Sequence, residues 1–142
     1  MFKKILAPVD LQETPLARRA LDIAVEQAQA SGGELIVMSV LPGFGMPLVA
    51  SFFPRDQLQN ALDTVHKELR KLIDGVLPTG LHGRALVVEG HPAECIVEQA
   101  EKQAMDLIVM SSASRRLERR LIGSCASRVV ELAHCPVLVV KS

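Results

Sequence analysis

The chain contains no tryptophan and no tyrosine, and only four of its 142 residues are phenylalanine. Sites for single-stranded nucleic acid usually stack the bases on aromatic rings, so this composition argues against such a site. Sixteen basic residues balance sixteen acidic ones. A net charge of zero argues against a dedicated nucleic-acid surface and against a polybasic membrane contact. A purine bound to this chain would have to lie between aliphatic side chains.

Paired cysteines and long apolar runs are also missing. Cys95, Cys125 and Cys135 are odd in number and lack C-x-x-C spacing, so we expect reduced thiols in a cytoplasmic protein. No pair of histidines or cysteines has the spacing of a metal site. No segment approaches the length of a membrane span, and we expect the opening MFKKILAPVD to form a strand rather than a signal peptide.

The sequence does contain a regular alternation of strand and helix patterns. This alternation predicts an α/β fold, in which parallel strands are joined by right-handed crossovers and helices cover both faces of one sheet. The length suits one compact domain spanning 1–142, with no linker or internal repeat. The expected strands are 2–9, 34–41, 84–89, 106–110 and 136–140, and the expected helices are 14–31, 56–77, 93–103 and 124–134.

The first of these helices has clear start and stop signals. Thr14 can cap its N-terminus, Pro15 suits its first turn, and the pair Gly32-Gly33 ends it. Asp10 precedes Glu13 by three residues, which is compatible both with half of a capping box and with a ligand-binding carboxylate.

A ligand site in such a sheet lies beyond the carboxyl ends of the strands. The most polar connection there is SSASRRLERRLIGS, residues 111–124. Gly123 allows close approach to the backbone, and Ser124 begins a helix whose N-terminus favours an anion. The same Gly-Ser pair is equally typical of a turn followed by a helix cap. The four arginines have the helical spacing of a solvated face, and Arg115, nearest the serines, is the one we expect to reach a phosphate.

Several stretches together resemble the universal stress protein family over the full length of the chain. They are KKILAPVD, ELIVMSV, VVEGHPAECIVEQAEKQAMDLIVM and LIGSCASRVVELAHCPVLVV. The resemblance implies a Rossmann-like three-layer fold, related to the adenine nucleotide alpha hydrolase-like folds, with a five-stranded parallel sheet in the order 3-2-1-4-5. It also implies a homodimer that pairs through the last strand, 136–140.

Nucleotide-binding members of that family hold ATP or AMP, with which Mg²⁺ can be associated, through G-x-x-G, nine residues and then Gly-Ser. Here serines 111 and 114 replace the two leading glycines, and eight residues follow Ser114. Serine is small but does not reach positive φ as easily as glycine. By similarity, the base and ribose would contact the end of the first strand, the second strand and Met110, with Asp10 accepting hydrogen bonds, and the loop would surround the phosphates. The implied residues are Ala7, Pro8, Val9, Asp10, Val40, Met110, Ser111, Ser114, Arg115, Gly123, Ser124 and Cys125.

Three functional hypotheses follow. The first is a cytoplasmic, homodimeric protein that binds an adenine nucleotide and acts in a stress response. The second is an interaction module without nucleotide that regulates a protein partner such as a transporter. Segment 42–55, which holds three of the four phenylalanines, could contact that partner or a dimer mate. The third is a slow ATP hydrolase or a self-phosphorylating protein. The lack of a lysine after Gly-Ser and of paired carboxylates for magnesium argues against catalysis.

Overall fold

The computed structural model describes residues 2–41, 55–112 and 122–141. Within them, strands and helices alternate along the chain, as the hydrophobic pattern predicts. The elements are β1 (Lys4–Pro8), α1 (Thr14–Ser31), β2 (Glu34–Leu41), α3 (Arg55–Val76), β3 (His82–Glu89), α4 (Pro92–Lys102), β4 (Leu107–Ser111), α5 (Ser124–Leu132) and β5 (Val137–Val140). The proposed partner-binding segment, apart from its last residue, lies outside the described residues.

The five strands form one parallel sheet in the order β3-β2-β1-β4-β5, which confirms the expected order. In the register, Ala7 of β1 lies opposite Val37 of β2, and Ile108 of β4 lies opposite Val137 of β5. Because all strands run the same way, their carboxyl ends meet at one edge of the sheet. The connections that follow β1, β2 and β4 therefore converge there.

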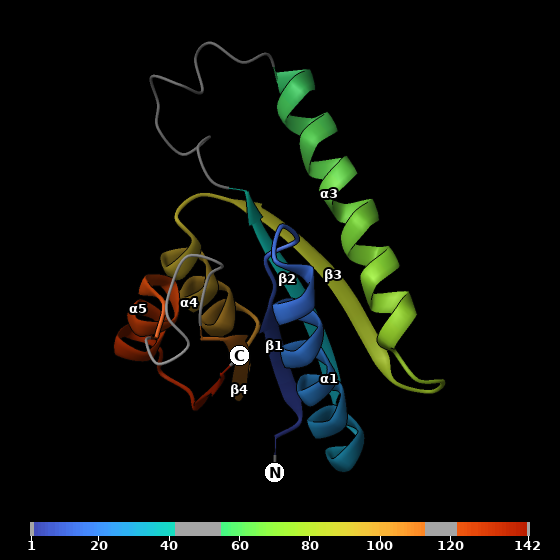
Figure 1. Ribbon diagram of the computed structural model, residues 1–142, viewed down its shortest axis with the longest axis vertical. Helices are drawn as coiled ribbons and strands as arrows, with labels where there is room; N and C mark the ends of the chain where they lie inside the picture. The colour runs from blue at the N-terminus through green and yellow to red at the C-terminus, as the bar shows by residue number, and fades with distance from the viewer. Residues whose placement is uncertain (1, 42–54, 113–121, 142) are drawn as a thin grey trace.

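Helices cover both faces of the sheet, and each face has its own apolar core (Figure 1). Successive strand residues point to opposite faces. Accordingly, Ile5 packs in the core that contains buried residues of α1 and α3, whereas Leu6 packs in the core that contains buried residues of α4 and α5. Both faces of the central strands are thus buried, which explains the long apolar run of β2.

Helix α1 begins one residue earlier than the expected cap at Thr14. Its N-cap is Glu13, and Thr14 instead donates from its hydroxyl to the carbonyl of Leu11 at 3.0 Å. The reason lies in the preceding turn. The carboxylate of Asp10 accepts the N–H of Gln12 at 2.9 Å, and its carbonyl accepts the N–H of Glu13 at 3.0 Å. This Asx turn replaces the capping box that the spacing allowed.

None of the described helices combines the length and the apolar character needed to cross a bilayer.

Candidate functional site

A cleft of about 490 Å³ lies at the carboxyl ends of β1, β2 and β4. It occupies the place where connections to opposite faces of the sheet diverge, as expected for an open parallel sheet. Its walls come from six regions of the chain. They are residues 8–13, Leu16 and Ala17 around the start of α1, 38–41 of β2, Val65 and Glu68 of α3, Pro92 and Ile96 of α4, 110–112 after β4, and 123–126 of α5.

The N-terminus of α5 forms the anion-attracting end of this cleft. Gly123 is the N-cap, with extended backbone, and its carbonyl accepts the N–H of Ser127 at 2.9 Å as the first bond of the helix. The backbone N–H groups before Ser127 have no partner within the helix. Together with the positive end of the helix dipole, they favour a negatively charged group in front of Ser124.

Two consecutive serines after β4 use their hydroxyl groups differently. The hydroxyl of Ser111 donates to the carbonyl of Leu16 at 3.0 Å and thereby ties β4 to α1. The side chain of Ser112 is only 1% exposed, and its hydroxyl has no hydrogen-bond partner among the described residues. Both residues line the cleft. The free hydroxyl is therefore the one on Ser112, a residue that the sequence motif does not single out.

The opposite end of the cleft is apolar and acidic. Val9, Val40 and Met110 supply aliphatic surface, as the absence of tryptophan and tyrosine requires. The charged side chains in the described lining are the carboxylates Asp10, Glu13 and Glu68. No basic side chain is present in that described part. The attraction for an anion is consequently confined to the end formed by α5.

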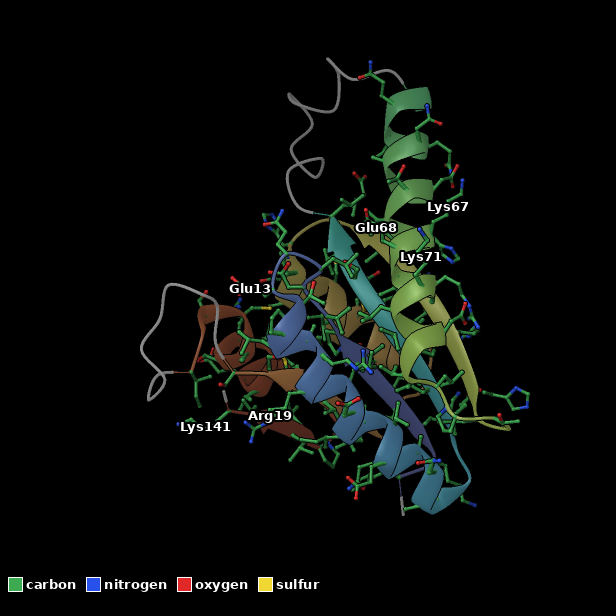
Figure 2. The ribbon with its side chains drawn as sticks, turned by 45° about the vertical axis from the view of Figure 1, so that its right-hand side comes forward. Glu13, Arg19, Lys67, Glu68, Lys71 and Lys141 are labelled. Carbon is green, nitrogen blue, oxygen red and sulfur yellow. The ribbon has the colours of Figure 1, made fainter. Side chains whose placement is uncertain are left out.

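Helix α3 contributes to the acidic rim from a distant part of the chain. Glu68 on α3 and Glu13 at the start of α1 lie near the same end of the sheet (Figure 2). Sequence reasoning missed both as cleft residues. Glu68 follows no motif, and its position depends only on how α3 packs against β2 and β3.

The pKa of Cys125 is raised, chiefly because the half-buried thiol is desolvated and secondarily because Glu94 and Asp10 place negative charge near it. A helix N-terminus can lower a thiol pKa, but burial outweighs that effect here. Cys125 therefore stays protonated near neutral pH and serves as a small wall residue, the simpler of the two roles its position suggested.

An ion pair connects the two helices on this side of the sheet. Arg128 Nε of α5 lies 3.4 Å from Glu94 Oε1 of α4. The pKa of Glu94 is lowered, first by a backbone hydrogen bond and then by Arg128. Glu94 also stands in the first turn of α4, where a negative charge is favourable.

The structure brings most of the residues implied by the family resemblance together in the cleft. Ala7 does not line it, because the side chain is fully buried in the core that includes α1. Ser114 and Arg115 lie outside the described residues. The members that do line the cleft are Pro8, Val9, Asp10, Val40, Met110, Ser111, Gly123, Ser124 and Cys125.

Metal-binding clusters are absent from the described ranges: no group of three or more histidine, cysteine, aspartate or glutamate side chains there could hold an ion.

The cAMP and dAMP complexes of two other proteins have the same fold as this chain. One is a universal stress protein in complex with cAMP, at 23% identity, with a TM-score of 0.68 and coverage of 98% of this chain and 96% of the other. The second is the universal stress protein from Archaeoglobus fulgidus in complex with dAMP, at 23% identity, with a TM-score of 0.63 and coverage of 99% and 98%. At these identities the likeness establishes the fold alone.

Two further comparisons are at higher identity. The universal stress protein MJ0531 of Methanocaldococcus jannaschii is 38% identical over 149 residues, which cover 99% of this chain and 83% of the relative. The solved structure of protein MJ0577, from the same organism, has a TM-score of 0.82 at 31% identity and covers 100% of this chain and 97% of that one. The model of the universal stress protein family matches residues 1–141. This chain therefore belongs to the universal stress protein family.

Proposed function

We propose that this protein binds an adenine nucleotide in the cleft and acts as a cytoplasmic regulatory protein in a stress response, with residues 1–142 working as one domain. The observation that carries the proposal is the position of the α5 N-terminus. It faces a cleft whose other walls are Asp10 and the aliphatic ends of β1, β2 and β4.

The polarity of the cleft orients the nucleotide. Its phosphate is placed at Gly123, Ser124 and Cys125, where unpaired backbone N–H groups attract an anion. Its ribose is placed beside Asp10, whose carboxylate accepts hydrogen bonds from hydroxyl groups. Its base then lies against Val40 and Met110. The complexes of family relatives with cAMP and dAMP support a ligand with one phosphate and an adenine base.

The second part of the proposal is a homodimer that pairs through β5. This strand is at the edge of the described sheet, and an unprotected edge is a template for pairing with another strand. Two large apolar side chains are exposed beside it, Leu138 on β5 at 38% and Val130 on α5 at 50%. A second copy of the chain would cover both.

Isothermal titration of nucleotide-free protein with AMP and ATP tests the binding proposal. ATP is titrated with and without Mg²⁺, because the metal would enter with the phosphates rather than through a preformed carboxylate cluster. We expect saturable heat with a dissociation constant in the micromolar range or below, a free energy of about −8 kcal/mol. An absence of heat at millimolar AMP and ATP would contradict the proposal.

A further inference from the structure

Ser112 is held in place by its backbone on two sides. Its N–H donates to the carbonyl of Val140 at 2.9 Å, and its carbonyl accepts the N–H of Gly123. The first bond ties it to β5, and the second ties it to the residue that caps α5. The side chain therefore cannot move away from the cleft without breaking bonds that hold the sheet and the helix together.

The hydroxyl of Ser112 is buried, lines the cleft and has no partner among the described residues. A buried hydroxyl without a partner is unfavourable, and such groups in native proteins call for a specific explanation. An acceptor oxygen in front of α5 supplies one. A phosphate there receives backbone N–H groups from the helix and an O–H from Ser112.

The neighbouring serine does not offer the same group. Ser111 occupies the position of the leading glycine in the nucleotide-binding pattern, but its hydroxyl already donates to Leu16. A hydroxyl has one proton to donate. Ser111 would have to break its bond to α1 before it could donate to a ligand, whereas Ser112 would not.

We propose that the Ser112 hydroxyl donates a hydrogen bond to a phosphate oxygen of the bound nucleotide and is a binding residue of this protein. The inference rests on the proposed function, since it places the phosphate at the start of α5. It specifies the ligand chemistry further: the group recognised at this point is a phosphate oxygen, not a hydroxyl or amino group of the nucleoside.

The test is a cycle of two ligands and two proteins. AMP and adenosine, which lacks the phosphate, are titrated into wild-type protein and the Ser112→Ala variant. Removing a hydrogen bond to a charged group lowers affinity about ten- to a hundredfold. We expect that loss for AMP and no more than about a twofold change for adenosine. Ser112→Thr, which keeps the hydroxyl, should restore the AMP-to-adenosine ratio, and this ratio cancels any general effect of the added methyl group.

Thermal unfolding without ligand is the second readout. Deleting a hydroxyl that lacks a partner should raise the Tm of Ser112→Ala by about 2–4 °C, whereas deleting a bonded one lowers it. Ser127→Ala, on the exposed side of α5 and outside the cleft, is the matched control and should leave the ligand ratio unchanged.

Three results would overturn the inference. An unchanged AMP-to-adenosine ratio in Ser112→Ala, with wild type binding AMP, would remove the Ser112 contact and leave the proposed function standing. A lower Tm of the variant would show that the hydroxyl already has a partner. Failure of wild-type protein to bind either ligand would refute the proposed function and the contact with it.

Discussion

The backbone N–H of Gly123 donates a hydrogen bond to the carbonyl of Ser112, and this bond joins the start of α5 to the end of β4. The two residues are ten positions apart in the sequence. Their contact places the helix N-terminus at the carboxyl edge of the sheet, beside β1 and β2. The anion-attracting end of the cleft thus depends on a sheet–helix junction rather than on the length of the connection between them.

Replacing Asp10 should weaken nucleotide binding and leave the fold intact. Asp10→Ala removes the carboxylate proposed to accept ribose hydroxyls, and we expect about a ten- to hundredfold loss of AMP affinity by titration. Its only described side-chain bond is the exposed one from Gln12, so stability should fall by no more than about 1 kcal/mol. Asp10→Asn keeps an acceptor oxygen and should lose less affinity. Equal affinity of all three proteins would exclude a role for Asp10.

Bound nucleotide should protect Cys125 from alkylation. The thiol lines the cleft, and its raised pKa keeps it protonated and slow to react at neutral pH. At an AMP concentration about ten times the dissociation constant, occupancy should slow its reaction with iodoacetamide about tenfold. Cys135, outside the cleft, is the internal control in the same mass spectra. Equal slowing of both thiols, or of neither, would contradict a ligand in this cleft.

A charge on the outer edge of the sheet should break the proposed dimer. Leu138→Lys places an ammonium group where the second copy would bury an apolar side chain, and like charges would face each other across the pair. We expect light scattering with size-exclusion chromatography to show a dimer for wild type and a monomer for the variant. Thr79→Lys, before β3 at the opposite edge, should stay dimeric. A monomeric wild type would refute the dimer.

Glu94 should make the protein sensitive to acid. Its folded-state pKa lies below the ordinary value of 4.5, so the stabilisation is complete above about pH 4.5 and is lost as the pH falls through the folded-state pKa. Glu94→Gln lacks this charge and should show a shallower fall of Tm between pH 5 and pH 3 (roughly the range in which such carboxylates titrate). Glu98→Gln on the same helix is the control. Parallel curves for Glu94→Gln and wild type would contradict the assignment.

Two glycines should respond to alanine in opposite ways. A Cβ on Gly33 would lie 2.3 Å from the carbonyl oxygen of Lys3, which is backbone and cannot move aside, whereas a Cβ on Gly75 meets nothing within 4 Å. Gly33→Ala should therefore destabilise by about 2 kcal/mol or more. Gly75→Ala, in helix α3, should stabilise by roughly 0.5–1 kcal/mol. Urea unfolding measures both, and equal shifts would refute the close approach at Gly33.

The fold and one end of the site could be predicted from the sequence because both depend on local patterns. Apolar runs bounded by glycine and proline indicated the strands, and their alternation with helices favoured a parallel sheet. Gly123 and Ser124 indicated a helix start that attracts an anion, whatever surrounds it.

Tertiary structure decided which side chains reach the cleft. Adjacent residues at a strand end point in different directions, so the register of β4 with its neighbours directs the hydroxyl of Ser111 to Leu16 and that of Ser112 into the cleft. The packing of α3 likewise brings Glu68 beside residues far from it in the sequence. Sequence spacing carries no information about these contacts, because they depend on distances between elements that only the folded chain brings together.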